Sequence, residues 1–578
     1  MSYSAKKNKT RLERERNMVA HSPDAPLKMV LCYPSRYSVG MANLGFQRVY
    51  ELFNLCEGVY CDRAFFPDPQ DVKEHFQKQI PVQGIESLKP LNEFDVIAFS
   101  FTYELDYIPA LEMLRFCKLP LRAEERRRSR SKRRKYPLII AGGIAISANP
   151  EPMADFLDLI IIGEAEPVAR PLADSIKNLG ADFGPENLAA EFLGQVGVYV
   201  PSAYEPDIGD GGRIQSIKSL PAAPAKVERA AASEKDLPVV QKIFTHDMEF
   251  SELGLIELMR GCRRGCRFCL EGYFYRPVRE ASLPAVVAGI EELAKNRHKL
   301  GLIAAIVPDY SKLNGLLEYL LREDIKLSIS SLRIEAIDER LIAMLKQSRN
   351  KTITLAPETG SMRLKCLINK EISEDRVISG MKIIGKYGFE RIKLYYQVGF
   401  PEESMSDIDS IVESARQISS ALAQGARAKK YPGVIELGIN TFVPKAWTAL
   451  QWAAMASRGE LEHKINRLRD QLGNEPGFVL KPGSVREALL QGIISRADRS
   501  ISNVLESISA GRSTPNELLR DQEMAKKYLR RREIDEILPW DIIEPGVKKS
   551  YLQRELERGA MGKISQGCRQ GCRDCGAC

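Results

Sequence analysis

Short runs of apolar residues alternate with longer segments of helical periodicity along most of this chain. The first runs are KMVLCY (28–33), DVIAFS (95–100), PLIIAG (137–142) and DLIIIG (158–163). Continuous apolar runs that end in small or polar residues are typical of parallel strands buried on both faces. The pattern predicts an open, Rossmann-like α/β domain over residues 28–205.

A second series of apolar runs begins after the first domain. Its members lie at 254–259, 301–307, 325–330, 351–356, 390–398 and 434–443. Segments with helical periodicity separate them, for example 282–296 and 373–388. Six strand-and-helix units in succession predict a partial parallel (βα)6 barrel over residues 251–450. In such a barrel, chemistry takes place at the carboxyl ends of the strands.

Composition divides the rest of the chain. Residues 1–27 carry many charges and no apolar run, which predicts a disordered basic tail. Residues 206–250 are rich in Gly, Pro, Ala and Ser, and we expect a linker there. The periodicity after residue 450 is helical, which predicts a mainly helical region over 451–560 and a cysteine-rich tail at 561–578.

The overall composition limits the class of protein. With 44% hydrophobic and 28% charged residues, the chain is typical of a folded globular protein. It has no targeting segment and no run of 18 apolar residues, so we expect a cytoplasmic protein that does not enter a membrane. The formal charge is +8, and the basic segment 124–135 favours a solvated insertion, with RNA or phosphate binding as the alternative.

Seven of the twelve cysteines lie in two similar phrases, GCRRGCRFC (261–269) and GCRQGCRDCGAC (567–578). In a reducing compartment this spacing indicates metal ligands rather than disulfides. Cys262, Cys266 and Cys269 lie on one short loop and can hold three irons of a [4Fe–4S] cluster, leaving the fourth iron open. A structural zinc site needs a fourth protein ligand.

The second phrase supplies that fourth ligand. Cys568, Cys572 and Cys575 repeat the spacing of the first phrase, and Cys578 follows three residues later. Four thiolates can close an iron–sulfur cluster completely or form a tetrahedral zinc site. A frayed chain end is the third interpretation. We favour a second iron–sulfur cluster, with zinc as the alternative.

The first phrase follows directly after the first predicted barrel strand, and CRRGCRFC resembles the CxxxCxxC motif of the radical S-adenosylmethionine (radical SAM) enzymes. The resemblance covers the whole barrel. It implies a [4Fe–4S] cluster whose open iron binds SAM, and whose electron cleaves SAM to a 5′-deoxyadenosyl radical. It also implies that Phe268 lies beside the adenine of SAM, and that a donor such as flavodoxin or ferredoxin supplies the electron.

Two later segments are similar to SAM-contacting strands of the same family. APETGSMRLKCLINK (356–370) resembles the fourth-strand segment, which implies that Glu358 meets the ribose of SAM and Arg363 its carboxylate. KLYYQVGFPEES (393–404) resembles the fifth-strand segment that passes the adenine, and Gly399 is its candidate cofactor contact.

The second-strand segment departs from the family pattern. It reads IVPDYS (306–311) where the superfamily commonly has Gly-Gly-Glu. We therefore expect Asp309 or Ser330 to hold the amino group of SAM.

The first domain resembles a cobalamin-binding-like domain, through AGGIAISANPEPMADFLDLIIIGEAE (141–166), and INTFVPKAWTALQW (439–452) resembles the sixth barrel strand of the subfamily that carries one. Domains that ligate cobalt from below use the histidine of a DxHxxG motif. Only His21 and His75 precede residue 200, and neither lies in that motif. We expect cobalamin to be absent or bound without a protein ligand, and the domain to shape the substrate entrance.

Two functions from different classes fit these observations. The first is a radical SAM iron–sulfur enzyme that cleaves SAM reductively and modifies an unidentified substrate, for which RNA is a candidate. The alternative is a nucleic-acid-binding protein with structural zinc sites. Neither interpretation identifies the residue that acts on a substrate.

Overall fold

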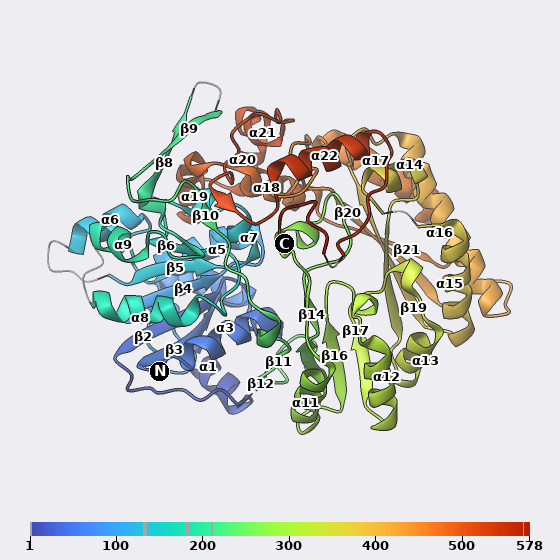
Figure 1. Ribbon diagram of the computed structural model, residues 1–578, viewed down its shortest axis with the longest axis horizontal. Coiled ribbons are helices and arrows are strands. Elements are labelled where there is room, and N and C mark those ends of the chain that lie inside the picture. The colour runs from blue at the N-terminus through green and yellow to red at the C-terminus, as the bar shows by residue number, and fades with distance from the viewer. Residues whose placement is uncertain (1–2, 131–135, 181–184, 210–211, 371, 570) are drawn as a thin grey trace.

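The computed structural model describes residues 3–130, 136–180, 185–209, 212–370, 372–569 and 571–578 of the chain. A Rossmann-like α/β domain and a partial parallel barrel lie side by side in Figure 1, and the C-terminal helices, in orange and red, lie along the top of both. The fold is therefore the predicted one: an α/β protein with two parallel-sheet units and a mainly helical C-terminal region.

The first domain is built on a six-stranded sheet in the order β3-β2-β4-β5-β6-β7. All strand pairs are parallel except β6 with β7. The strands are β2 (Leu27–Tyr33), β3 (Val59–Phe65), β4 (Val96–Ser100), β5 (Leu138–Gly142), β6 (Leu159–Ile161) and β7 (Val198–Tyr199). The helices are α2 (Tyr37–Ala42), α3 (Leu44–Asn54), α4 (Pro69–Lys78), α5 (Tyr107–Phe116), α6 (Ala123–Arg130), α7 (Ile144–Ala148), α8 (Ala169–Leu179) and α9 (Pro185–Phe192). The four predicted strands are confirmed as β2, β4, β5 and β6.

Strand β3 has no counterpart among the predicted strands, because two of its residues are charged. All seven residues of β3 are buried, including Asp62 and Arg63. Arg63 donates through Nε to Glu86 at 2.7 Å and through Nη2 to Glu15 at 2.6 Å. Two carboxylates therefore compensate the buried guanidinium, and the strand keeps its place in the sheet without an apolar sequence.

Residues 3–27 differ from the disordered tail that was predicted for residues 1–27. Helix α1 (Tyr3–Glu13) lies on the first domain, where Lys7 is 2.5 Å from Asp68 and Arg11 is 2.9 Å from the same carboxylate. After this helix, β1 (Arg16–Asn17) pairs with β12. The charged residues suggested a solvated tail. In the structure, Lys7 and Arg11 form ion pairs with the first domain.

The expected linker at 206–250 is also ordered over its described residues. It makes a hairpin and then pairs with three other parts of the chain. Its strands are β8 (Tyr204–Ile208), β9 (Ile214–Ser219), β10 (Val227–Glu228), β11 (Val239–Val240) and β12 (Ile243–Phe244). Strand β10 pairs with β22 (Ile543–Glu544) of the C-terminal region, and β11 pairs with the first barrel strand. The segment therefore connects both domains and the C-terminal region.

The barrel consists of two four-stranded sheets, β11-β13-β16-β17 and β18-β19-β20-β21. A single parallel bridge between Leu332 and Leu355 joins them. The six predicted strands are confirmed as β13 (Gly254–Glu257), β16 (Lys299–Ile303), β17 (Lys326–Ile329), β18 (Thr352–Glu358), β19 (Arg391–Val398) and β20 (Val434–Thr441). Strand β21 (Phe478–Pro482) extends the second sheet in parallel with β20, and the sequence did not predict it. The helices are α11 (Leu283–Ala294), α12 (Leu313–Arg322), α13 (Glu339–Gln347), α14 (Met362–Leu367), α15 (Glu374–Tyr387) and α16 (Met405–Gly425).

The C-terminal region is mainly helical, as predicted. Its helices are α17 (Arg458–Leu472), α18 (Val485–Arg496), α19 (Ser502–Ser509), α20 (Pro515–Arg520), α21 (Gln522–Leu529) and α22 (Lys549–Ala560). Among the helices that the structure describes, none has both the length and the apolar character needed to cross a membrane.

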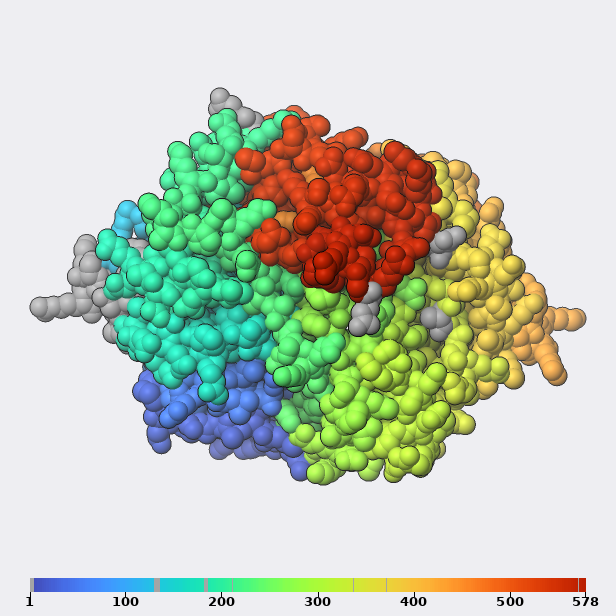
Figure 2. Space-filling view, viewed as in Figure 1, coloured from blue at the N-terminus to red at the C-terminus, as the bar shows by residue number. Residues whose placement is uncertain are grey.

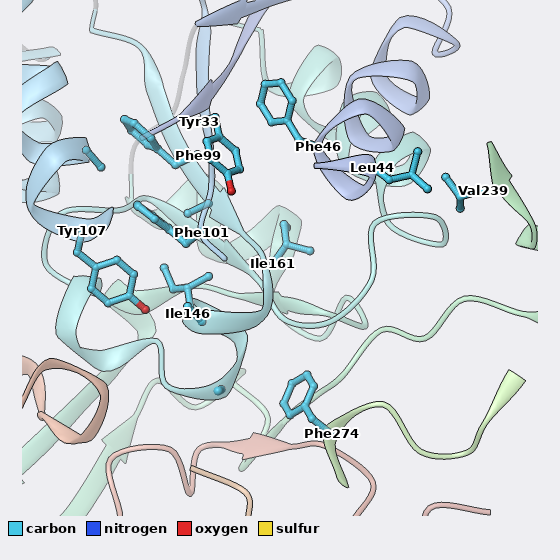
Figure 3. Packing of buried hydrophobic residues seen from close by; sticks show 14 of the residues in the cluster. Tyr33, Leu44, Phe46, Phe99, Phe101, Tyr107, Ile146, Ile161, Val239 and Phe274 are labelled. Carbon is cyan, nitrogen blue, oxygen red and sulfur yellow. The ribbon is translucent and has the colours of Figure 1, made fainter. Parts of the chain in front are cut away.

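One apolar core runs through the first domain and continues into the barrel. Figure 3 shows Phe46, Phe99 and Ile161 of the first domain, with Val239 of β11 and Phe274 of the barrel loop at the edge of the same cluster. Burial of this shared apolar surface holds the two domains together.

Replacing Arg63 with alanine should destabilise the protein by about 3–5 kcal/mol, because it leaves Glu15 and Glu86 buried without their partner. Thermal unfolding followed by circular dichroism measures the effect. Lys78→Ala is the control, since its pair with Glu74 lies in solvent. If the two variants melt at the same temperature, the Arg63 cluster does not stabilise the domain.

Candidate functional site

The first cysteine phrase forms a tight loop at the carboxyl end of the first barrel strand, which is where the sequence predicted it. The loop follows β14 (Met259–Arg260) and leads into α10 (Glu271–Phe274). Gly261 begins it with a φ of +82°, and a Cβ at this position would lie 2.6 Å from the carbonyl oxygen of Tyr275. Only glycine fits this turn.

The three thiols of this loop are close neighbours with hydrogen-bond donors around them. Burial, together with the nearby Cys266 thiol, raises the pKa of Cys262 to about 11 and that of Cys269 to about 12. The amide of Arg264 donates to Cys262 Sγ at 3.4 Å, and Arg333 Nη1 donates to Cys266 Sγ at 3.7 Å. Such donors stabilise thiolates, which are the form that binds iron.

The four cysteines of the second phrase also lie near one another. Cys575 is buried and Cys578 is exposed, with Cys568 and Cys572 in between. Burial raises the pKa of Cys578, and the other three thiols add to this shift. Across all the residues that the structure describes, no three His, Cys, Asp or Glu side chains lie in an arrangement that could hold a single metal ion.

Glu358 and Arg363, expected at the ribose and carboxylate of SAM, have different partners. Glu358 ends β18 and accepts from Lys370 Nζ at 2.9 Å and from Gln397 Nε2 at 2.8 Å. Arg363 is half exposed on α14 and donates to Asp407 at 2.6 Å. Glu358 therefore points into the end of the barrel, whereas Arg363 is held on the start of α16.

Asp309 and Ser330, the two residues expected to hold the amino group of SAM, lie in different places. Asp309 accepts from Nε and Nη2 of Arg264 at 2.8 and 2.6 Å, so it is tied to the cysteine loop. Ser330 is exposed after β17. The arrangement places Asp309 beside the first phrase and leaves Ser330 at the surface.

Phe268 lies against the fifth-strand segment. Its ring centroid is 5.9 Å from that of Phe400, which follows Gly399. Gly399 has a φ of +93°, and its amide donates to Glu403 at 2.6 Å. The structure thus brings Phe268 and Gly399 to the same edge of the barrel.

Three further polar side chains fix this region. Arg264 of the cysteine phrase holds Asp309, Arg333 donates to Cys266 Sγ, and Lys370 fixes Glu358. Sequence reasoning assigned no role to Arg333 or Lys370, because Arg333 lies in the loop after β17 and Lys370 lies just after α14, positions that many surface residues share.

A cavity of about 480 Å³ lies between the two domains. Its first-domain wall contains Gly142, Gly143 and Gly163, at the carboxyl ends of β5 and β6, and its barrel wall contains Glu257 and Arg260. This volume is in the range of small-molecule sites. The described residues that line it include no histidine, so they offer no imidazole ligand to a cobalt.

Comparison with known families accounts for both domains. Residues 45–201 match the N-terminal domain of radical SAM proteins, and residues 256–415 match the radical SAM superfamily. The chain belongs to the radical SAM superfamily. It is therefore an enzyme whose cofactors are a [4Fe–4S] cluster and SAM, as the sequence predicted.

Two curated proteins are similar to this radical SAM chain. An uncharacterised protein of Methanocaldococcus jannaschii is 27% identical over 457 residues, which cover 78% of this chain and 88% of that protein. An uncharacterised methyltransferase of Pyrococcus horikoshii is 23% identical over 311 residues, which cover 51% of this chain and 61% of that protein.

Two solved radical SAM structures are similar at 12% identity. The methyltransferase TsrM from Kitasatospora setae, with cobalamin and a [4Fe–4S] cluster bound, matches with a TM-score of 0.48 over 85% of this chain and 99% of its own. The cobalamin-dependent enzyme OxsB, with aqua-cobalamin bound, matches with a TM-score of 0.46 over 93% and 80%.

Arg363→Ala should weaken SAM binding tenfold to a hundredfold if its guanidinium holds the SAM carboxylate, since a charge-assisted hydrogen bond contributes about 1.5–3 kcal/mol. Isothermal titration of the cluster-loaded protein with SAM measures this. Arg391→Ala is the control, because Arg391 is a half-exposed arginine paired with Glu436. Unchanged affinity would leave Arg363 with a structural role, through its contacts with Asp407 and the carbonyl of Glu402.

Proposed function

We propose that Cys262, Cys266 and Cys269 hold the SAM-binding [4Fe–4S] cluster, and that the enzyme cleaves SAM reductively to modify a substrate. The observation that carries this proposal is the buried cysteine loop at the carboxyl end of β13, with donors from Arg264 and Arg333 on its sulfur atoms. When bound, the cluster supplies the electron that breaks the carbon–sulfur bond of SAM.

The remaining residues of the site bind and orient SAM. Phe268 packs against one face of the adenine, and the turn at Gly399 lets the backbone approach it. Glu358 accepts the ribose hydroxyls, in an orientation fixed by Lys370. Asp309 accepts from the amino group of SAM, close to the cysteine loop. These contacts would bind SAM next to the cysteine loop that would hold the cluster.

The first domain shapes the entrance for the substrate in this proposal, because its cavity opens between the carboxyl edges of both sheets. The similarity to the uncharacterised methyltransferase of Pyrococcus horikoshii makes methyl transfer one reaction to test. Cobalamin, if it serves that reaction here, has no histidine ligand from the cavity lining.

RNA stays a candidate substrate, although the described part of the basic segment lends it little support. Arg126 of that segment is fully buried and lies 3.0 Å from Asp158, so it cannot contact a nucleic acid. Residues 131–135 lie outside the described residues. The alternative of a nucleic-acid-binding protein with structural zinc does not account for the superfamily match over the barrel.

Changing Cys262, Cys266 and Cys269 together to alanine should lower the formation of 5′-deoxyadenosine at least a hundredfold, because the cluster is lost with its ligands. Anaerobic incubation with SAM and dithionite, followed by mass spectrometry, measures the product. Cys56→Ala, a buried thiol of the first domain, is the control and should behave as the wild type.

Formation of 5′-deoxyadenosine at the wild-type rate in the triple variant would contradict the proposal. For the substrate, cellular RNA and small molecules from a strain that lacks the protein can be compared with those of its parent. A modification that is absent from the strain and restored by the purified enzyme identifies the substrate class.

A further inference from the structure

The second cysteine phrase lies directly against the first. The amide of Cys568 donates to the carbonyl of Arg263 at 2.5 Å, and Arg263 is the residue after Cys262. The preceding Gly567 is so close that an added Cβ would lie 2.4 Å from the same carbonyl oxygen. In Figure 1 the end marked C accordingly lies near the centre of the molecule. Two cysteine phrases that are about half the chain apart in sequence are thus neighbours in space.

Side chains of the barrel hold the tail in this position. Arg267 of the first phrase donates to the carbonyl of Lys563 at 2.9 Å and to Ser565 Oγ at 3.0 Å. Asn369 accepts from the amide of Ser565 at 2.8 Å and donates to the carbonyl of Gly265 at 3.0 Å. Arg267 and Asn369 therefore tie the first phrase to the start of the tail, two to four residues before the second phrase.

A buried cation faces the tail thiols. Arg276 is 3% exposed, and its Nη2 atom has no hydrogen-bond partner in the part of the chain that the structure describes. The rings of Tyr273 and Tyr551 lie 4.8 and 5.6 Å from its guanidinium carbon. The guanidinium of Arg276 interacts electrostatically with Cys568 and with Cys575, so it lies beside the tail thiols. An anion beside a buried guanidinium with an unused donor stabilises it, and thiolates and the cluster they bind would supply that anion.

We propose that Cys568, Cys572, Cys575 and Cys578 hold a second, fully ligated [4Fe–4S] cluster that passes electrons to the SAM-binding cluster. This inference rests on the proposed function of the first cysteine loop. Four thiolates leave no iron open for SAM, so the second site is suited to electron transfer rather than to SAM chemistry.

The two cysteine sites differ in solvent exposure, and this difference indicates the direction of electron transfer. Cys262 and Cys266 are buried, so a protein donor cannot contact the first loop through them. The second phrase reaches from the exposed Cys578 to the amide of Cys568, which is bonded to the first loop. One electron passes from a reduced donor protein to the second cluster and then to the first. From the first cluster it enters the sulfonium of SAM, and the C5′–S bond breaks to give methionine and the 5′-deoxyadenosyl radical.

The surface around the tail favours an acidic donor. Figure 2 shows the dark red tail atoms on the exposed face of the molecule. Glu557 and Asp574 are the exposed acids of this surface, and its exposed basic residues outnumber them: Lys548, Arg554, Arg558, Lys563, Arg569 and Arg573. A net positive surface attracts an acidic one-electron donor such as a flavodoxin.

The test uses the full chain with Cys572→Ala and Cys578→Ala together, which leaves Cys568 and the buried Cys575 in place. Iron per chain should fall from about eight to about four, with no change in zinc. SAM cleavage driven by reduced flavodoxin should fall at least tenfold, whereas cleavage driven by dithionite, a small reductant, should stay within about threefold of wild type. Cys56→Ala with Cys117→Ala, two thiols of the first domain, is the matched control for both measurements.

A second variant keeps every cysteine and changes only exposed residues, so its folding is not at risk. Arg569→Glu with Arg573→Glu should keep about eight irons and raise the KM for flavodoxin at least fivefold, with no effect on the dithionite-driven rate. An unchanged KM for flavodoxin would contradict the proposal that electrons enter the protein through the tail.

Other outcomes would distinguish an iron–sulfur cluster from a zinc site and would test the electron-transfer role separately. Loss of zinc with unchanged iron in the Cys572 and Cys578 variant overturns the cluster in favour of a structural zinc site. Unchanged iron and zinc overturn the site itself. Loss of iron with unchanged flavodoxin-driven cleavage overturns the electron-transfer role. Failure of the wild type to cleave SAM with dithionite contradicts the function proposed for the first loop, whatever the tail variants do.

Discussion

The two cysteine phrases depend on one buried guanidinium. Arg267 is fully buried between Cys266 and Phe268, and each of its three nitrogens has a partner. Nε donates to Glu555 of α22 at 3.2 Å, and Nη1 donates to the carbonyl of Cys366 at the end of α14 at 2.8 Å. A buried charge is stable only when it is paired and hydrogen-bonded, so this side chain is a strong constraint on its surroundings. It holds the cysteine loop, the fourth-strand loop, α22 and the tail in one arrangement.

The polarity of the two sheets determines where the rest of the site lies. Parallel strands direct all their carboxyl ends to one edge, and in this enzyme the edge of the first domain faces the barrel across the 480 Å³ cavity. Arg260, which follows β13, bridges the two edges by donating to Glu164 at 2.9 Å and to Glu166 at 3.1 Å. The cavity is therefore bounded by both domains, and its barrel wall includes Arg260 and Glu271, which lie on either side of the cysteine loop.

Most strands were predictable from the apolar runs. A strand that is buried on both faces is apolar along its whole length, and this shows in a short stretch of sequence. The prediction failed where burial depends on a distant partner. Strand β3 contains Arg63, whose partner Glu15 lies 48 residues earlier. The linker strand β10 pairs with β22, more than 300 residues away. The cysteines stand out in the sequence because their spacing is local, whereas the contact of Arg333 with Cys266 exists only in the folded chain.

The repeated phrase has the same cysteine spacing in two different environments, and its arginines show the difference. In the first phrase, Arg263 lies 2.5 Å from Glu280, and Arg267 is buried among carbonyls and a carboxylate. The corresponding residues of the second phrase, Arg569 and Arg573, are exposed. Water solvates a charge at the surface, whereas a buried charge needs partners supplied by the fold. The first phrase is therefore built into the barrel through its arginines. The second is held through its backbone and presents its arginines to solvent, which is the arrangement expected of a site that exchanges electrons with another protein.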